Sequence, residues 1–528
     1  MEATIAPVKA TSSVSKLLDR LGLSDDLSVH IPSAGKIAAA SGALVAAYAL
    51  YEQAKFNSFK KTNDGKGLSG PKYVVPFIGG IVEMVKNPYK FWEKQRLYSF
   101  PGYSWHSLAG QFSVFVTDAA LCRHIFNHNS EDSLLLALHP VAKTVLGERN
   151  IAFLHGDEHK QIRRSFAALF SRKALGVYVR KQDQIIQEHL QQWLSKEGPR
   201  EIRNFVRDLN QETSQMVFAG PYLDDPKEKA EFGVAYRNMT DAFLGFPLCI
   251  PGTGVWKGRQ GRFFIIKVLT KAARRSKARM AAGQEPECLL DFWSTQVLKE
   301  VEEAKANGTP LPFYYEDTKM ADTVMDFLFA SQDASTASLV WTLTMMAERP
   351  DILNRVRAEQ LKLREDPTAP IVNEILNEAV FPRQVVKEVL RYRPPAPMVP
   401  QHVMQPFKVD DNYTAPKGTL LIPSLWGASL QGYENAAEFD PDRFGPERKE
   451  DVKYAGNFLV FGHGPHYCVG KEYAQTHLAC FLSRISTAID WTRVRSEISD
   501  NTIYLPTLYP ADSVLDIKPR AVVVAATA

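Results

Sequence analysis

The 528-residue chain has the composition of a large globular protein, since 45% of its residues are hydrophobic and 23% are charged. This balance excludes disorder over most of the length. The net charge is only +4, and no basic stripe alternates with aromatic residues. We therefore expect no nucleic-acid partner. Five cysteines without a CxxC pair favour a reducing compartment and argue against a zinc site.

The N-terminal 70 residues differ from the remainder. An uncharged run over 37–51, rich in Ala and Leu, predicts a membrane anchor. The run is shorter than the roughly 18 to 20 residues of a confident span, so a buried or interfacial helix is the alternative. Lysines after the run outnumber those before it, which places the following domain on the cytosolic side. A Gly- and Pro-containing linker then predicts a boundary near Pro71, with an N-terminal segment over 1–70 and a single catalytic domain over 71–528.

The body of the chain is mainly helical by its hydrophobic pattern. The stretch 112–117 alternates like a strand, so a small sheet begins early, and helical patterns dominate after it. No internal repeat or long low-complexity linker divides the chain. We expect one large domain, mainly α with small β-sheets.

A predicted helix over 322–349 is apolar nearly all round and therefore belongs in the interior. Asp333 lies midway along it, where an unpaired carboxylate costs several kcal/mol. One explanation is a buried salt bridge. The other is proton delivery in a reaction, with the hydroxyls of Ser335 and Thr336 and with water completing a relay.

A glycine-rich loop near the C-terminus carries the most specific pattern. Gly462, Gly464 and Gly470 surround Cys468, and Phe461 lies seven residues before the cysteine. A helical pattern follows, and amides at a helix N-terminus favour a thiolate. A thiolate in such a loop suits axial ligation of haem iron, with the phenyl ring shielding the sulfur. The alternative is a structural cysteine in a turn.

The spacing Phe-x-x-Gly-x-x-x-Cys-x-Gly resembles the haem-binding loop of the cytochrome P-450 family. The resemblance implies the cytochrome P-450 fold and haem b, with Cys468 as the axial ligand of the iron. In that family a Trp-x-x-x-Arg pair and an arginine before the cysteine contact the haem propionates. This chain has His159 with Arg163, and His466, at those positions. His402 is a further expected propionate contact. The other haem-binding residues that the resemblance implies are Phe461, Gly464 and Gly470.

Two further segments match the family in order and spacing. Glu388 and Arg391, followed by Arg443, imply a triad that locks the segment behind the haem-binding loop. As an isolated exposed pair they would contribute under about 1 kcal/mol. The proline-rich run 394–400 is incompatible with a helix and should cross the pocket in extended form. The expected substrate-pocket residues are Phe329, Ala330, Ala334, Met398, Val399 and Leu508.

Two departures from the general pattern point to one branch of the family. Ala334 replaces the usual threonine after the helix acid, and His466 replaces the usual arginine. Both recur in the sterol C-22 desaturases of fungi and of plants and algae, to which the chain is most similar. The resemblance implies a haem-thiolate monooxygenase-type enzyme that introduces the C-22(23) double bond into a sterol side chain. It also implies O2, NADPH electrons delivered by cytochrome P-450 reductase, and the endoplasmic reticulum membrane, with the catalytic domain facing the cytosol.

Three other functions are compatible with the sequence. One is another sterol- or lipid-hydroxylating P-450. The second is a haem-thiolate enzyme that rearranges fatty-acid hydroperoxides without O2, although the retained Asp333 and the uninterrupted loop from Phe461 to Cys468 argue against it. The third is a non-enzymatic haem or sterol carrier, which would leave Asp333 without a role.

Overall fold

The computed structural model describes residues 34–99, 101–137, 139–505 and 507–520. The chain divides into two units, Met1–Lys60 and Lys61–Ala528, so the break lies upstream of the predicted boundary near Pro71. In the first unit, helix α2 (Ala34–Phe59) contains the whole predicted anchor, 37–51. Within the described ranges, no helix has both the length and the apolar character that crossing a membrane requires.

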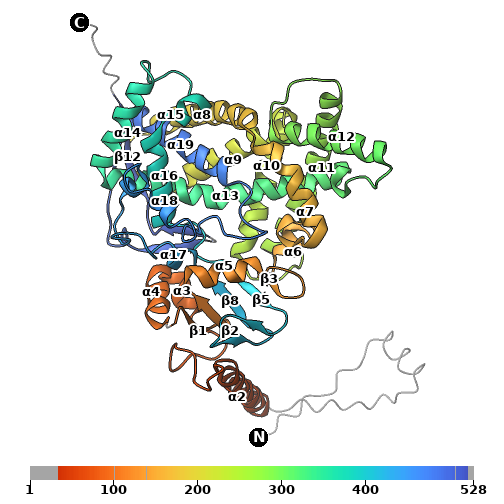
Figure 1. The fold of residues 1–528 in the computed structure, drawn as a ribbon, viewed down its shortest axis with the longest axis vertical. Coiled ribbons are helices and arrows are strands. Elements are labelled where there is room, and N and C mark those ends of the chain that lie inside the picture. The colour runs from red at the N-terminus through yellow and green to blue at the C-terminus, as the bar shows by residue number, and fades with distance from the viewer. Residues whose placement is uncertain (1–33, 100, 138, 506, 521–528) are drawn as a thin grey trace. The chain divides into compact units, whose positions relative to one another are not determined.

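Helices make up most of the second unit, which confirms the predicted mainly α fold with small sheets (Figure 1). The helices and 3₁₀ turns (η) of its first half are α3 (Ile81–Lys86), α4 (Pro88–Tyr98), α5 (Ala119–Asn127), α6 (Ala142–Leu146), η1 (Ile151–Phe153), α7 (Gly156–Ser165), η2 (Phe166–Phe170), α8 (Arg172–Leu194), α9 (Arg203–Phe218), η3 (Gly220–Tyr222), α10 (Pro226–Asp241), η4 (Ala242–Leu244) and α11 (Gly254–Ala281). Those of its second half are α12 (Leu289–Asn307), η5 (Phe313–Tyr315), α13 (Asp317–Glu348), α14 (Pro350–Leu363), α15 (Asn373–Glu378), α16 (Val380–Tyr392), α17 (Leu425–Ala428), η6 (Pro441–Phe444), α18 (Glu450–Lys453) and α19 (Lys471–Ala488).

The largest sheet has five strands in the order β1-β2-β8-β5-β3. The predicted strand over 112–117 is β2, which pairs antiparallel with β1 and parallel with β8. The smaller sheets are β10-β11, β4-β12-β9 and β6-β7. The strands are β1 (Tyr103–Leu108), β2 (Gln111–Val116), β3 (Leu134–Leu136), β4 (Arg200–Glu201), β5 (Gln401–Val403), β6 (Phe407–Lys408), β7 (Thr414–Ala415), β8 (Leu420–Pro423), β9 (Ile489–Arg493), β10 (Thr502–Leu505), β11 (Thr507–Pro510) and β12 (Val514–Pro519).

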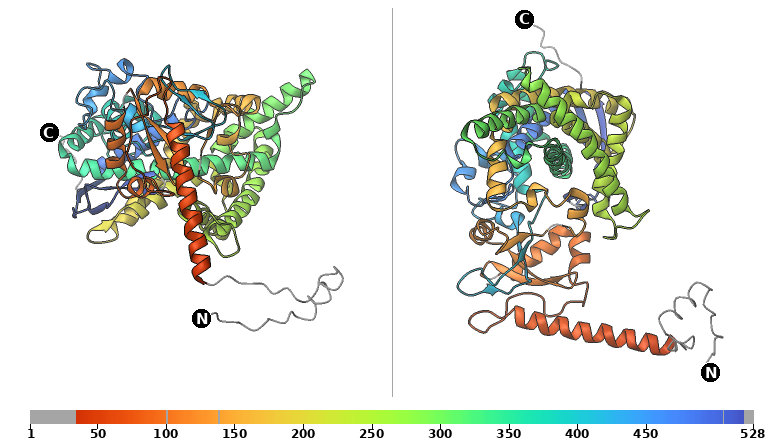
Figure 2. Two further views of the ribbon diagram at one scale, coloured as in Figure 1. Left: turned by 90° about the horizontal axis from the view of Figure 1, so that it is seen from below. Right: turned by 90° about the vertical axis from the view of Figure 1, so that its right-hand side faces the viewer.

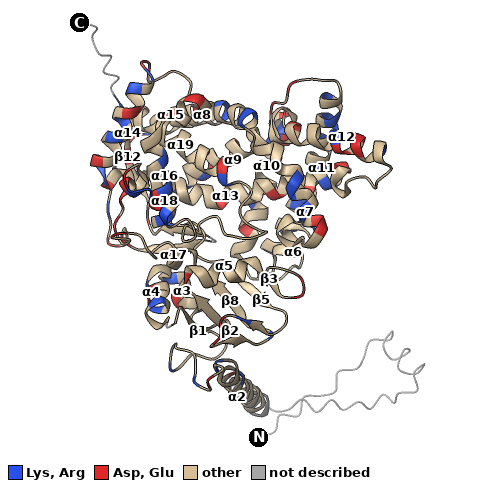
Figure 3. Cartoon of the chain, viewed as in Figure 1, with Lys and Arg blue, Asp and Glu red and all other residues tan. Residues whose placement is uncertain are grey.

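Helix α13 is the interior helix that the sequence predicts. It runs across the view of Figure 1 and is seen end-on in the right-hand view of Figure 2, with other helices around it. Several of its hydroxyls donate to carbonyls of the same helix. Those of Thr342 and Thr344, for example, donate to the carbonyls of Ser338 and Val340 at 2.8 and 3.0 Å. This local bonding allows polar side chains to lie in an apolar environment. Charged residues of both signs occur on outer helices such as α12 and α14 (Figure 3).

Two hydrophobic clusters meet α13 at different points along its length. Residues 320–328 belong to a cluster with α11 and α12, and residues 337–346 belong to a second cluster with α16 and α19. Between them lies a stretch of small and polar side chains, 330–336. The middle of the helix therefore lies between the two apolar clusters, where a site can form.

The predicted triad of Glu388, Arg391 and Arg443 is present and completely buried. The Glu388 carboxylate accepts two bonds from Arg391, each of 2.7 Å, and one from Nε of Arg443 at 3.0 Å. It also accepts the backbone N–H of Asp440 at 2.9 Å. The two arginines donate in turn to carbonyls of the loop before η6, including that of Glu438. The triad thus fixes the chain that leads to the cysteine loop.

Candidate active site

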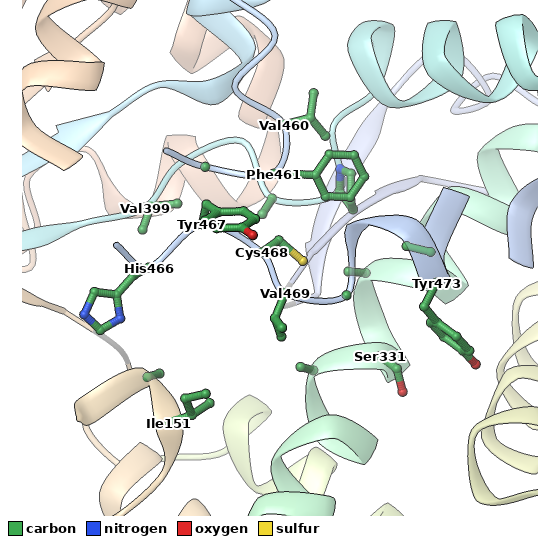
Figure 4. A pocket seen from close by; sticks show the side chains of 18 of the residues that line it. Ile151, Ser331, Val399, Val460, Phe461, His466, Tyr467, Cys468, Val469 and Tyr473 are labelled. Atoms are coloured by element: carbon green, nitrogen blue, oxygen red, sulfur yellow. The ribbon is translucent and has the colours of Figure 1, made fainter. Parts of the chain in front are cut away.

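A cavity of about 400 Å³ lies between α13, the cysteine loop and the segment around η1 (Figure 4). Its lining is mostly apolar. Residues predicted for the site that line it are Ala330, Ala334, Ser335, Val399, Phe461, His466, Cys468, Gly470, His159 and Arg163. The structure therefore brings together the helix, the proline-rich run and the cysteine loop that the sequence singled out.

The cysteine loop depends on two glycines in the left-handed region. Gly462 has φ +72° and Gly464 has φ +73°, and a Cβ added at Gly464 would lie 2.6 Å from the carbonyl oxygen of Phe126. The Cys468 N–H donates to the Phe461 carbonyl at 2.8 Å, which closes the loop. Helix α19 starts three residues later, at Lys471. Gly464 thus shapes the loop from behind, and it does not line the cavity.

The expected thiolate at Cys468 is not a property of the protein alone. Desolvation by the surrounding protein raises the pKa of this thiol. The Gly470 backbone N–H and the charges of Arg163 and Lys471 lower the pKa, but they do not outweigh the desolvation. A metal ion deprotonates a coordinating thiol outright. The sulfur opens into the cavity (Figure 4), so it is available to such a metal.

Three histidine rings lie together at one edge of the cavity, which His159 and His466 line. The rings of His159 and His466 lie 4.0 Å apart at 19°, and His155 approaches His466 at 5.1 Å. Burial lowers the pKa of His466 to about 3 and that of His159 to about 4. The expected pH-dependent cation at His466 is therefore a neutral ring at pH 7. Arg163, which stacks over the Tyr467 ring at 4.5 Å, supplies the positive charge instead.

These residues fit a haem group. The cavity offers a thiol for the iron, a glycine-bounded loop, apolar walls, and ring N–H and guanidinium donors at one edge for carboxylates. The sequence missed His155, whose position four residues before His159 on the chain was the available signal.

Replacing His466 with alanine is expected to weaken haem retention by about tenfold, because it removes a donor and the partner of the His159 ring. The ratio of haem to protein after gel filtration measures the effect. The exposed residue His128 serves as the control, since His128→Ala leaves the cavity intact. An unchanged haem content in His466→Ala would show that other groups hold the propionates.

Asp333 does not line the cavity, although Ala334 beside it does. Its carbonyl accepts the Tyr509 hydroxyl at 3.2 Å. Its carboxylate makes no ion pair within the described residues, so the predicted alternative of a buried salt bridge is wrong. Arg207 lies close enough to lower the pKa of Asp333, but its guanidinium binds Asp241 at 2.9 Å. Burial outweighs Arg207 and raises the pKa of Asp333 to about 6.

The hydroxyls of α13 divide between the cavity and the interior. Ser335 lines the cavity as predicted. Thr336 does not, because its hydroxyl donates to the Gln332 carbonyl at 2.7 Å and accepts from Asn210 at 3.2 Å. The relay role expected for Thr336 is therefore corrected to a structural one. The sequence missed two cavity-lining serines, Ser331 and Ser338, which the three- and four-residue spacing around Ser335 would have indicated.

Strand alternation explains two further corrections. Val399 lines the cavity and its neighbour Met398 does not; Met398 packs against the apolar cluster beside the large sheet. Gln401 lines the cavity, whereas His402 does not line it and lies 3.4 Å from the Gln111 side chain. Successive side chains of an extended chain point to opposite faces.

Two expected pocket residues belong to the core instead. Phe329 is tilted against the Phe243 ring at 5.1 Å and packs on the cluster around α11. Leu508 is fully buried in β11, and its carbonyl accepts the indole N–H of Trp341 at 2.8 Å. Neither lines the cavity.

Comparisons with known proteins agree with this arrangement. The family model described as "Cytochrome P450" matches residues 68–500. "Cytochrome P450 710A4" of Arabidopsis thaliana is 38% identical over 464 residues, which are 87% of this chain and 92% of that protein. "C-22 sterol desaturase erg5" of Aspergillus fumigatus is 33% identical over 482 residues, 87% of this chain and 90% of that protein. The solved structure "Retinoic acid bound cyanobacterial CYP120A1" has a TM-score of 0.70 at 21% identity, covers 86% of this chain and 99% of its own, and shows the same fold.

Proposed function

Because the chain belongs to the cytochrome P450 family, we propose that it is a sterol desaturase that introduces the C-22(23) double bond into a sterol side chain. One observation carries the proposal. Cys468 and Ala334 of α13 line the same apolar cavity, and the chain matches a C-22 sterol desaturase over most of both lengths.

The family implies a haem iron cofactor, which supplies the activation of O2 when it is bound. In this chain Cys468 would hold the iron, and His159, Arg163 and His466 would hold the carboxylates. Phe461 lines the cavity beside the thiol and would shield it from water.

The reaction removes two hydrogens from neighbouring side-chain carbons. Together with two electrons and two protons, these reduce one O2 to two water molecules and leave a carbon–carbon double bond. The task of the protein is to hold both C–H bonds in place, since a misplacement on the order of 1 Å can cost about 100-fold in rate. Ile151, Ala334 and Val399 supply apolar walls for this purpose. Because Asp333 lies outside the lining, water must carry a proton between its carboxylate and the cavity.

The proposal includes NADPH electrons that arrive through cytochrome P450 reductase, and a location at the endoplasmic reticulum membrane with the catalytic domain in the cytosol. Support for the membrane location comes from the Ala- and Leu-rich composition of 37–51 and the lysines after it. Fractionation of cells that express the full chain, with and without residues 1–60, tests this part. Equal recovery of both forms in the soluble fraction would contradict it.

The desaturation itself is tested with purified protein, its reductase, NADPH and a sterol with a saturated side chain. Mass spectrometry should detect the 22-ene. Products that are only hydroxylated would assign the chain to the hydroxylating P450s. Turnover of fatty-acid hydroperoxides without NADPH would replace the proposal with a rearranging enzyme.

The acid Asp333 yields a prediction with opposite signs for activity and stability. Burial raises its pKa from 3.8 to about 6, so the folded protein binds this proton more tightly than the unfolded chain. Stability from this group is lost as pH rises from about 4 through 6. Asp333→Asn should therefore stabilise the fold above pH 6, yet lower turnover by about 100-fold. If Asp333 donates a proton, the wild-type rate should fall between pH 6 and 8 as the acid ionises, and Asp333→Asn should abolish this fall.

Thermal unfolding and a pH–rate profile measure both effects. Asp241→Asn is the matched control. The charge of Asp241 raises the pKa of Asp333, and the Asp241 side chain does not line the cavity. This control should keep turnover and shift the midpoint of the profile to slightly lower pH. Unchanged turnover in Asp333→Asn, with haem retained, would leave the acid without a catalytic role.

A further inference from the structure

One wall of the cavity is held by an acid that belongs to none of the motifs discussed above. Ile151 and Ala152, in the turn η1, line the cavity. Figure 4 shows Ile151 on the chain that faces the Cys468 loop across the opening. Asp326 on α13 is 5% exposed, and its carboxylate accepts Nδ2 of Asn150 and, at 2.9 Å, the backbone N–H of Ile151.

Asn150 completes the connection from the other side. Its Oδ1 accepts the N–H of Ala152 at 2.9 Å, so its amide joins Asp326 to the start of η1. Burial raises the pKa of Asp326 well above its usual value, while the bonds from the Ile151 N–H and the Asn150 side chain act in the opposite direction. Asp326 lies one helical turn before Ala330, which lines the cavity. The same helix therefore carries part of the cavity wall and fixes the wall opposite the cysteine loop.

A second acid of α13 pairs with an arginine that lies beside the same segment. Asp322, one turn before Asp326, pairs with Arg262 of α11 at 2.5 Å. The guanidinium of Arg262 lies only 2.5 Å from where a Cβ on Gly147 would be, and Gly147 has φ +95°. The segment 147–153 is thus bonded to α13 at Asn150 and Ile151, and its Gly147 lies close against Arg262 of α11.

We propose that Asp326 is a positioning residue for the desaturation: through Asn150 and the Ile151 N–H it sets the place of the Ile151 wall, and thereby which sterol side-chain carbons lie nearest the haem. The inference rests on the proposed function for its substrate. Its physical basis is the stiffness of a β-branched side chain, whose position follows its backbone closely. A shift of that backbone on the order of 1 Å is large for a reaction that needs two neighbouring C–H bonds in place.

A reciprocal exchange of side chains tests the proposal. Asp326→Asn places an amide where both neighbours donate, so one N–H must face another N–H. In the double variant N150D/D326N, the new amide again accepts from Ile151 and donates to the new carboxylate, which still accepts from Ala152. Asp317→Asn is the matched control, since Asp317 lies on the first turn of α13, pairs with Lys277 of α11 and does not line the cavity.

We expect hydrogen exchange at the Ile151 amide to rise by about tenfold or more in Asp326→Asn. The sterol Kd, from the shift of the haem absorption band, should weaken by about tenfold, and the share of 22-ene among the products should fall. The double variant should return all three quantities towards wild type, and Asp317→Asn should leave them unchanged. Equal haem content in all variants excludes a general folding defect.

Two results would overturn the proposal. Unchanged exchange at Ile151 in Asp326→Asn would show that the acid does not hold the wall. Raised exchange with an unchanged sterol Kd and product pattern would show that the wall does not position the substrate. If the wild type binds no sterol and makes no 22-ene, the proposed function fails, whereas the exchange comparison still decides whether Asp326 holds η1.

Discussion

Replacing Glu388 with glutamine is expected to destabilise the fold by about 3 to 5 kcal/mol. The side chains of Glu388, Arg391 and Arg443 are each 0% exposed. Glu388 pairs with both guanidiniums, and Arg443 has a second carboxylate partner in Glu450 at 3.1 Å, so Arg391 is the cation that depends on Glu388. Removing one partner of a buried pair leaves an uncompensated charge, which is far more costly than the net stabilisation that the intact pair supplies. Domains have only about 5 to 15 kcal/mol of stability, so the loss takes a large share of it.

The unfolding midpoint and the yield of soluble, haem-loaded protein measure this effect. Asp442→Asn is the matched control, since it breaks the exposed Arg355–Asp442 pair at the turn that carries Arg443. An exposed pair contributes less than about 1 kcal/mol, so the control should unfold like wild type. Equal midpoints for Glu388→Gln and the control would show that the triad is dispensable for the fold.

Patterns that join distant segments were predictable from the sequence. The order of Glu388, Arg391, Arg443 and Cys468 along the chain implied both the triad and the cysteine loop, and the structure contains the triad with every partner paired. The apolar run around Asp333 likewise predicted the interior helix α13. Such features depend on residue type and spacing, which a sequence displays directly.

The direction of individual side chains was less predictable. Whether Ser335 or Thr336 faces the cavity depends on the rotation of α13 about its own axis, which packing against α9 and α11 decides. His402 and Met398 were misplaced because alternation along an extended chain requires the starting register to be known. His466 was expected as a cation, and only the burial of the stacked rings shows that it is neutral.

The contacts of Asp326 had no signal in the sequence at all. In the sequence, Asp326 is indistinguishable from any other polar residue of a helix. Its partner Asn150 lies 176 positions away from it. Long-range bonds of this kind arise from the packing of α13 against the segment after α6. They are the part of the site that the structure adds to the motifs.

Replacing Cys468 with serine is expected to abolish turnover and the spectral signature of thiolate ligation. Of the five cysteines, all within the described residues, only Cys468 lines the cavity. A hydroxyl stays protonated where a thiol ionises on a metal, and it supplies none of the electron density by which a thiolate favours O–O cleavage. Losing a hydrogen-bond partner of a metal ligand typically lowers metal affinity or activity by about 10- to 100-fold, and losing the ligand itself should lower them further.

The difference spectrum of the reduced protein with carbon monoxide measures the ligation, and product analysis measures the turnover. Cys249→Ser is the matched control, because Cys249 is exposed and outside the cavity. Cys122, Cys288 and Cys480 are buried elsewhere, and burial raises the pKa of each of these thiols. None of them is placed to substitute for the ligand. A thiolate spectrum in Cys468→Ser would therefore contradict the assignment of the cavity itself as the haem site, and with it the desaturase proposal.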